Sequence, residues 1–70
     1  MVDKRHMVGA RIRNLRESNG LSQRKFCMMI DMNRTYFSEV EKGKRNISLD
    51  NLIKIADGLN IGLEDLFRDM

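Results

Sequence analysis

Residues that typically begin and end helices divide the 70-residue chain into short segments. Gly20 and Gly43 each follow a stretch of helical apolar periodicity, at the place where a left-handed residue commonly ends a helix. Ser22, Asn33 and Ser48 each precede another such stretch, where a side-chain oxygen can accept hydrogen bonds from the free amides of a first turn. The sequence therefore predicts short helices at roughly residues 5–18, 23–30, 34–42, 49–59 and 63–67.

Each predicted helix carries an apolar face. The spacing of these residues, three and four positions apart, matches one side of an α-helix. We therefore expect an all-α fold in which five helices surround a single core. The residues assigned to the inward faces are Val8, Ile12, Leu15, Phe26, Cys27, Ile30, Phe37, Val40, Glu41, Leu49, Leu52, Ile53, Ala56 and Leu59.

The composition excludes other classes of protein. With no Pro, no Trp, three Phe and one Tyr, the chain is poorly suited to a β-sandwich or β-barrel. The single cysteine, Cys27, cannot form an internal disulfide, and it has no metal-ligand spacing with the single histidine, His6. The sequence has no apolar run near the roughly 18 residues of a membrane span, and residues 1–7 lack the apolar stretch that a signal peptide is expected to have. We expect a cytoplasmic protein with no metal, no cofactor and no membrane association.

The charge is unevenly distributed along the chain. Residues 1–45 carry 11 Lys and Arg against five acids, a net charge of +6, whereas residues 46–70 carry two against five, a net charge of −3. The basic region favours a polyanionic partner such as nucleic acid, and an ordinary solvated surface is the alternative. The acidic end is expected to have a different role.

Residues 22–42 are the part most informative about function. Two helices of about eight residues are joined there by a tight turn, and helices this short are marginal on their own. When two such helices are locked at a steep angle, the second is presented outward, where it can enter the major groove of DNA, about 12 Å wide. The region therefore predicts a helix-turn-helix.

Five motifs lie in and around this region: Leu21-Ser22-Gln23, Phe26-Cys27, Tyr36-Phe37-Ser38, Val40-Glu41-Lys42-Gly43 and Asn46-Ile47-Ser48-Leu49. Each is weak alone, but together they resemble the phage-repressor/Cro-type (XRE-type) helix-turn-helix family. The resemblance extends from about Val8 to Phe67, nearly the whole chain. Within the family, residues 33–36 and 43–48 are most similar to the controller proteins of bacterial restriction–modification systems, which are small dimeric DNA-binding regulators.

The resemblance implies a lambda-repressor-like DNA-binding fold. Residues 1–70 would form one domain, with the helix-turn-helix at 22–42 and a dimerisation segment at about 59–70. The implied function is a transcriptional regulator that binds a two-fold symmetric operator in double-stranded DNA as a homodimer. Activation of transcription would further need a contact with RNA polymerase. A prophage repressor is the alternative within the family.

The resemblance also implies DNA contacts at the start of the helix at 23–30, on and just before the helix at 34–42, and in the loop after it. Arg34 and Thr35 are at base-reading positions, and Arg34 can donate two parallel hydrogen bonds to O6 and N7 of guanine. Glu39 can accept from cytosine N4 or hold Arg34 in place. Arg45 is expected at phosphates or at a neighbouring groove edge. The other residues of the expected DNA-binding set are Gln23, Asn33, Tyr36, Ser38, Lys42, Lys44 and Asn46. The alternatives are an ordinary solvated helix face and, for the tyrosine, a half-buried ring.

Four residues receive a structural role from the resemblance. Arg16 and Glu41 are expected to pair and to fix the helix at 34–42 against the first helix, since an unpaired charge near the core would be costly. Cys27 stands where the family usually has Ala and is expected in the core, a redox switch being the alternative. Asp31 occupies a turn position often filled by Gly, and Asp can adopt that backbone at some cost.

An apolar stripe near the C-terminus is the candidate dimer interface. A monomer of this size cannot be expected to cover it fully. The alternative is that the stripe closes the core of the monomer. Its residues are Leu59, Ile61, Leu63, Leu66, Phe67 and Met70.

Two functions from other classes are weighed against DNA binding. An antitoxin-type protein-interaction module would use the same fold. Exposure of Met28 and Met29 would favour it, although we expect these two residues to cover the core. An enzyme lacks support because the chain has no obvious paired-carboxylate site, no Cys–His pair at helical spacing and no phosphate-binding glycine loop.

Overall fold

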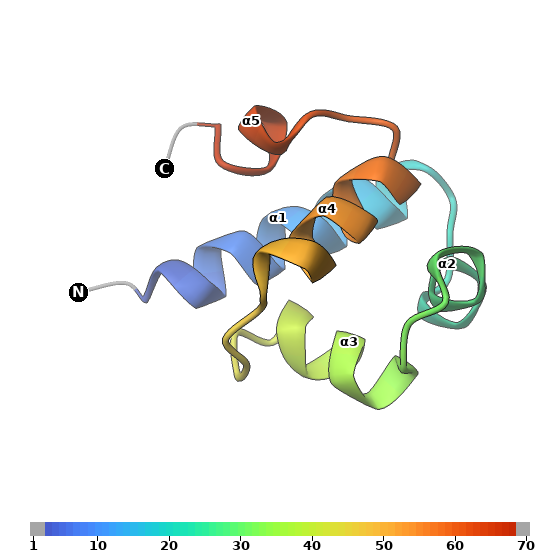
Figure 1. Ribbon diagram of the computed structural model, residues 1–70, viewed down its shortest axis with the longest axis horizontal. Coiled ribbons are helices and arrows are strands. Elements are labelled where there is room, and N and C mark those ends of the chain that lie inside the picture. Colours follow the sequence, from blue (N-terminus) through green and yellow to red (C-terminus); the bar gives the residue numbers. More distant parts are fainter. Residues whose placement is uncertain (1–2, 69–70) are drawn as a thin grey trace.

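Five α-helices make up most of residues 3–68, the part of the chain that the computed structural model describes. They are α1 (Lys4–Ser18), α2 (Gln23–Ile30), α3 (Arg34–Glu41), α4 (Leu49–Gly58) and α5 (Leu63–Leu66), and these described residues contain no β-strand. The molecule measures 33 × 22 × 22 Å, with α3 and α5 on opposite sides of α1 and α4 (Figure 1). The predicted all-α fold is confirmed, and the helix bounds agree with the prediction to within one residue.

The predicted capping residues begin their helices as expected. The side-chain oxygens of Ser22, Asn33 and Ser48 each accept a hydrogen bond from the amide three residues later, at 3.1, 2.9 and 3.2 Å. Asp3 caps α1 through the amide of Arg5 at 2.9 Å, which starts this helix one residue earlier than predicted. Because each cap satisfies an otherwise free amide, it stabilises its helix by about 1 kcal/mol.

The tight turn between α2 and α3 depends on a left-handed residue. Asp31 has φ 53° and ψ 56°, and its amide donates to the carbonyl oxygen of Cys27. The amide of Met32 donates to the same oxygen at 3.0 Å. Asp adopts this backbone at a cost that Gly would not have, as the sequence predicts, and the turn is nevertheless closed.

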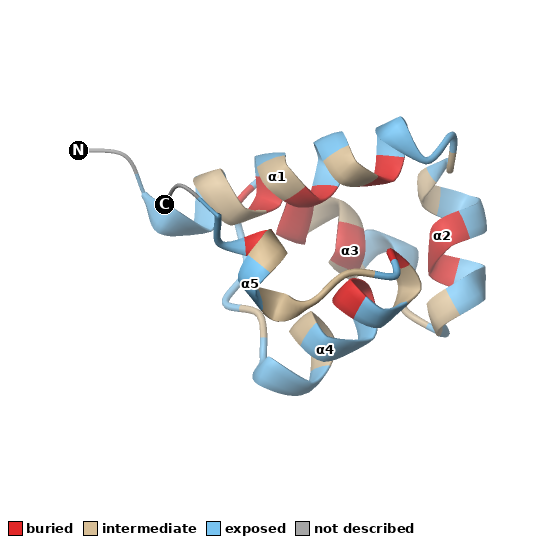
Figure 2. Ribbon diagram, turned by 90° about the horizontal axis from the view of Figure 1, so that it is seen from above, coloured by how far each residue is buried: buried red, intermediate tan, exposed pale blue. Residues whose placement is uncertain are grey.

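The core lies where all five helices meet. The rings of Phe26 in α2 and Phe37 in α3 are 5.4 Å apart at an interplanar angle of 51°, a favourable tilted arrangement. This contact packs the two helices of the helix-turn-helix against each other. The other buried apolar residues are Ile12, Cys27, Val40, Ile55, Ala56, Leu59 and Leu66 (Figure 2).

The inward face of α4 differs from the prediction at two positions. Leu49 and Ile53 are 63% and 39% exposed, so their assignment to the core is wrong. Ile55 is completely buried in their place. The apolar residues of α4 form a broad face with Ile55 at one edge and Ile53 at the other, so two overlapping stripes have helical spacing. The stripe that contains Ile55 and Leu59 faces the core, and the other is left on the surface.

Helices α1 and α3 approach each other closely at Gly9. A Cβ atom at this position would lie 2.6 Å from the carbonyl oxygen of Glu41 and closer still to that of Val40. Both neighbouring atoms belong to the backbone, which cannot move aside as a flexible side chain can. The absence of a side chain at Gly9 therefore sets the distance between the two helices.

A buried ion pair fixes the orientation of α3 on α1. The guanidinium of Arg16 donates to both carboxylate oxygens of Glu41, from Nε at 2.7 Å and from Nη2 at 3.1 Å. Its Nη1 donates to the carbonyl oxygen of Leu21 at 2.7 Å, and Nε2 of Gln23 donates to Glu41 at 2.8 Å. These bonds link α1, the turn before α2, the start of α2 and the end of α3. This is the pairing that the family resemblance implies.

The polar cluster is internally satisfied. The side chains of Arg16 and Glu41 are 8% and 4% exposed, and no buried side-chain nitrogen or oxygen in residues 3–68 lacks a hydrogen bond. The hydrogen bonds to Glu41 raise the pKa of Arg16 above its ordinary value. The guanidinium of Arg16 therefore remains charged in the folded protein, and removing Glu41 would leave this buried charge without its partner.

The close approach at Gly9 predicts that Gly9→Ala destabilises the fold. We expect a loss of about 1–3 kcal/mol in the free energy of unfolding, measured by urea denaturation, because α1 and α3 must separate. Asn14→Ala, on the exposed side of the same helix, is the control and should change stability by less than about 0.5 kcal/mol. Stabilisation of Gly9→Ala, as helix propensity alone would give, would contradict the close approach.

The buried ion pair predicts a large difference between single and double variants. Glu41→Ala strands the Arg16 charge and should lower the free energy of unfolding by about 3–5 kcal/mol. Replacing both residues, as Arg16→Met with Glu41→Leu, should recover most of this loss. The control is Glu17→Ala, which removes an exposed ion pair with Arg13 and should cost less than about 1 kcal/mol. If Glu41→Ala and Glu17→Ala lower the free energy of unfolding equally in chemical denaturation, the prediction is refuted.

Candidate nucleic-acid interface

The outer side of α3 carries polar and charged side chains. Its inner side is occupied by Phe37, Val40 and Glu41, which are all buried. Helical geometry therefore turns the residues between them outward. Together with the start of α2 they line an open depression, whose residues are Gln23, Arg34, Thr35, Ser38, Glu39 and Lys42. The structure thus brings together six residues of the predicted DNA-binding set on one face.

Asn33 and Gln23 each have a structural role in addition to their place at this face. Oδ1 of Asn33 caps α3, and Nε2 of Gln23 donates one hydrogen bond to Glu41. An amide nitrogen carries two N–H groups, so each residue keeps donor capacity for a further partner. The family resemblance implies only a DNA contact for Gln23, and its bond to Glu41 is an additional finding.

Tyr36 lies at the edge of α3 and contacts two other segments. Its ring is half-buried, and its hydroxyl accepts a hydrogen bond from Nδ2 of Asn51 in α4 at 3.2 Å. The guanidinium carbon of Arg45 lies 5.5 Å from the ring centroid, within the range of a cation–π contact. The half-buried ring proposed as an alternative is therefore present, and the hydroxyl retains its own O–H as a donor.

Glu39 forms an ion pair in the structure, but not with the residue expected. Its Oε1 accepts from Nε and Nη2 of Arg45, at 3.3 and 3.1 Å. The expectation that Glu39 holds Arg34 is therefore wrong, because Arg45 in the following loop takes that place. The sequence gives little indication of the Glu39–Arg45 pair, because the conformation of the loop cannot be predicted from residue spacing.

The loop between α3 and α4 is also attached to α1. Nη1 of Arg5 donates to Oδ1 of Asn46 at 3.2 Å, across 41 positions of sequence. Arg5 also pairs with Asp3 at 2.8 Å, and its hydrogen bonds lower the pKa of that carboxyl to about 2. Asn46 is thus held in place at the edge of the face, and Arg5 is an additional basic residue there that no sequence motif indicates.

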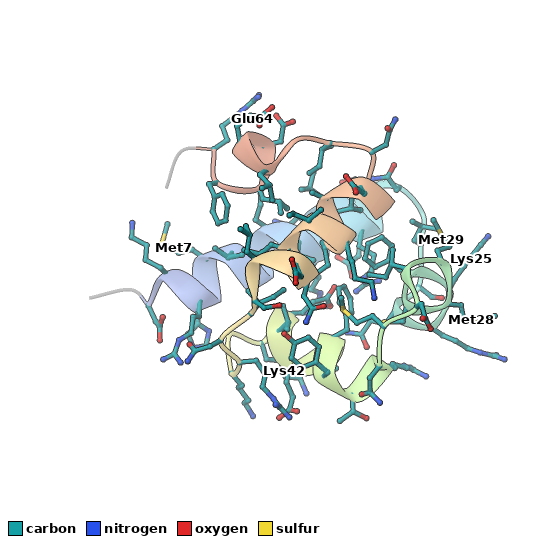
Figure 3. The ribbon with its side chains drawn as sticks, viewed as in Figure 1. Met7, Lys25, Met28, Met29, Lys42 and Glu64 are labelled. Atoms are coloured by element: carbon teal, nitrogen blue, oxygen red, sulfur yellow. The ribbon has the colours of Figure 1, made fainter. Side chains whose placement is uncertain are left out.

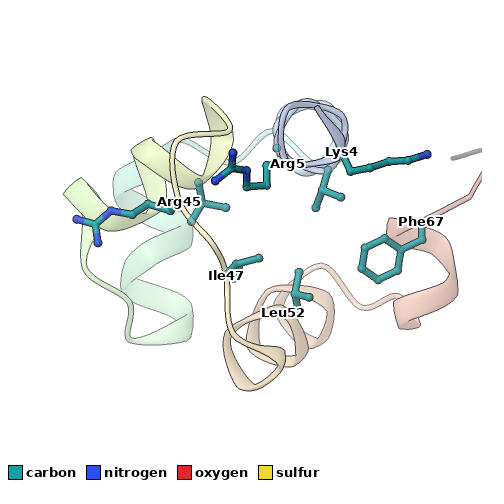
Figure 4. A pocket seen from close by; sticks show the side chains of 9 residues that line it. Lys4, Arg5, Arg45, Ile47, Leu52 and Phe67 are labelled. Carbon is teal, nitrogen blue, oxygen red and sulfur yellow. The ribbon is translucent and has the colours of Figure 1, made fainter. Parts of the chain in front are cut away.

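An apolar cavity lies behind the loop (Figure 4). Its volume is about 120 Å³, and it is bordered by the start of α1, the loop, α4 and Phe67. Val8, Ile47 and Leu52 line it, and Arg45 borders it with its guanidinium pointing away (Figure 4). The remaining lining residues are Lys4, Arg5, Gly9 and Val40.

The predicted dimer residues fall into different classes of burial. Leu59 and Leu66 are core residues of the single chain, which is the alternative given for the stripe. Ile61 and Leu63 are half-buried against the core, and Phe67 is exposed. Met70 lies outside the described residues.

The side chains of α2 opposite the core are unexpectedly apolar. Met28 and Met29 are 73% and 55% exposed, so the expectation that they cover the core is wrong (Figure 3). They lie on the outer side of α2 because Phe26 and Cys27 occupy its inner side. Cys27 is buried, as expected, and burial raises the pKa of its thiol, which disfavours a reactive thiolate.

No group of three or more His, Cys, Asp or Glu side chains in residues 3–68 could hold a metal ion. No helix within this range is both long enough and apolar enough to cross a membrane.

Comparisons with known proteins agree on one family. The model of a family described as helix-turn-helix matches residues 12–66. The control protein C.MunI from a Mycoplasma species is 48% identical over 71 residues, which cover 100% of this chain and 96% of that protein.

Solved structures of controller proteins have the same fold. The restriction–modification controller protein C.AhdI from Aeromonas hydrophila superimposes with a TM-score of 0.89 at 39% identity, over 91% of this chain and 97% of that one. The controller protein C.Esp1396I, solved as a tetramer in complex with its natural 35 base-pair operator, has a TM-score of 0.85 at 25% identity, over 96% and 88% of the two chains. The chain therefore belongs to the helix-turn-helix family and, within it, to the controller proteins of restriction–modification systems.

Proposed function

We propose that this protein is a transcriptional regulator that binds a two-fold symmetric DNA operator as a homodimer. The observation that carries the proposal is the single face on which α2, α3 and the following loop gather polar and basic side chains. The buried Arg16–Glu41 pair turns this side of α3 outward. Membership of the controller family supports the proposal, and C.Esp1396I, a relative, binds its operator as a tetramer. The protein would act in the cytoplasm, together with its DNA.

The proposed contacts divide into base reading and backbone binding. Arg34 and Thr35, at the exposed start of α3, would enter the major groove and contact base edges. Arg45 would reach a neighbouring groove edge from the loop. The residues proposed to contact the DNA backbone are Gln23, Asn33, Tyr36, Ser38, Lys42, Lys44 and Asn46, through amides, hydroxyls and ammonium groups.

Dimerisation is proposed through the exposed apolar side of α4 and the residue after α5. One recognition helix reads few base pairs, whereas a symmetric dimer places two such helices about 34 Å apart, one turn of DNA. Leu49 and Ile53 lie one turn apart on α4, and the exposed Phe67 follows the helix that packs on α4 and lines the apolar cavity with Leu52. Ile61 and Leu63 would contribute their exposed parts.

The proposed function is tested by selecting the sequences that the protein binds from a random DNA pool. The salt concentration is about 150 mM, because nonspecific binding to phosphates is weakened at this ionic strength. The mass of the protein–DNA complex is measured alongside. A two-fold symmetric site bound by two or four chains would support the proposal. Absence of any enriched sequence would overturn it.

An antitoxin-type interaction module is the second candidate function. The exposure of Met28 and Met29 favours it, since flexible methionine side chains suit protein-binding surfaces. A contact with RNA polymerase would likewise need a surface away from DNA, and the acids of α5 lie opposite α3 (Figure 1). If no DNA sequence is enriched in the selection, a protein partner becomes the leading hypothesis.

The base-reading role predicts a sequence-dependent loss for Arg34→Ala. Binding to the selected operator should weaken by about 1–3 kcal/mol, with relaxed preference at one position in each half-site, measured by fluorescence anisotropy on single-base variants. Lys44→Ala is the matched control: it should weaken binding to all sequences alike and reduce the salt slope by about one. An equal loss on every sequence for Arg34→Ala would exclude a base-reading role.

The proposed dimer surface predicts dissociation of the double variant Leu49→Gln with Ile53→Gln. Both side chains are exposed, so the chain should still fold, but sedimentation equilibrium should give the 8.2 kDa of one chain. Operator affinity should fall by about 100-fold or more, because each half-site is then bound independently. Met28→Gln with Met29→Gln removes an equally apolar pair from α2 and should leave mass and affinity unchanged. A dimer that persists in the α4 variant would place the interface elsewhere.

A further inference from the structure

An acidic side chain lies on the face proposed to meet DNA. Glu39 lines the same depression as Arg34, Thr35 and Lys42. A carboxylate that faces phosphates is repelled by them, so its presence on this face needs a physical reason. The structure supplies one, because Oε1 of Glu39 accepts two hydrogen bonds from the guanidinium of Arg45.

The guanidinium of Arg45 is held from a second direction. It lies over the ring of Tyr36, 5.5 Å from the centroid, and Asn51 holds the hydroxyl of that tyrosine. The neighbouring Asn46 is bonded to Arg5 of α1. A loop arginine that would otherwise sample many rotamers is therefore confined by a carboxylate and an aromatic ring, both supplied by α3.

Confinement leaves part of the guanidinium free to bind. It carries five N–H groups, and the bonds to Glu39 use one on Nε and one on Nη2. Three donors remain on a partly exposed group at the edge of the face. Because the ion pair is electrically neutral as a unit, Arg45 then adds less to the general attraction for phosphates than a free arginine would.

We propose that Glu39 determines sequence selectivity as a positioning residue: it holds Arg45 over Tyr36 in the orientation needed at the operator and withholds it from phosphates elsewhere. This inference rests on the proposed function. It differs from base reading by Glu39 itself, in which the carboxylate would accept from cytosine N4. In the arrangement observed, the carboxylate acts through Arg45.

The test is Glu39→Gln, which removes the charge with little change in size. Two DNA probes are used: the operator selected with the wild-type protein and a random-sequence duplex of equal length. With Arg45 released, affinity for the random duplex should rise about fivefold at about 150 mM salt, and its salt slope should steepen by about one. The ratio of operator to random affinity should fall about tenfold. An unchanged slope and an unchanged ratio would overturn the proposal.

The same substitution in an Arg45→Ala background separates positioning from direct reading. If Glu39 acts through Arg45, adding Glu39→Gln to Arg45→Ala should change neither the slope nor the base preferences any further. If it still relaxes the preference at one base pair in each half-site, Glu39 reads that base and the proposal is wrong. Arg45→Lys keeps the positive charge but not the planar donor geometry of the guanidinium. This variant should therefore lose selectivity for the operator, while its salt slope stays within about one unit of the wild-type value.

Glu64→Gln is the matched control for loss of one negative charge. Glu64 is exposed on α5, on the opposite side of the molecule from Lys42 (Figure 3). Both the affinity ratio and the salt slope should stay at the wild-type values. A wild-type protein that enriches no sequence would overturn the proposed function and this inference together. If an operator is enriched but Glu39→Gln leaves the affinity ratio and the salt slope at the wild-type values, only the role of Glu39 is overturned.

Discussion

The buried Arg16–Glu41 ion pair is the interaction on which the other features of this small domain depend. Helix α3 has eight residues, too few to be stable without tertiary contacts. The pair attaches its C-terminal end to α1, while Leu21 and Gln23 attach the start of α2 to the same cluster. Because desolvation offsets much of the attraction in a buried pair, we infer that its main effect is to specify one orientation of α3. An apolar contact would allow neighbouring rotations of the helix more readily.

A helix anchored from its inner side has its outer side available for binding. Arg34 and Thr35 are exposed and contribute nothing to the core. Asn33 and Tyr36 have structural contacts as well, the first as a cap and the second through Asn51. Side chains held in this way lose less conformational entropy when they bind a partner. The face thus combines free side chains at its centre with restrained ones at its edges.

The parts of the structure that depend on local chemistry could be predicted from the sequence, and the parts that depend on loop geometry could not. Caps such as Ser22 and the left-handed Asp31 follow from the preferences of single residues. Periodicity does not identify the inward face of α4, because its apolar residues satisfy helical spacing in two overlapping ways. The bond from Arg5 to Asn46 joins residues 41 positions apart, and no periodicity reports it. Likewise, the choice of Arg45 over Arg34 by Glu39 depends on where the loop folds back.

The surplus apolar surface of α4 has a cause in the size of the chain. A domain of 70 residues buries a modest fraction of its surface, and here one stripe of α4 suffices to close the core. The second stripe, with Leu49 and Ile53, adds nothing to the core and would be a liability on a protein that remained monomeric. A second copy of the chain would bury it and would also supply the second recognition helix that a symmetric site requires. The same few residues would thus increase the stability of the protein and double the length of DNA that it reads.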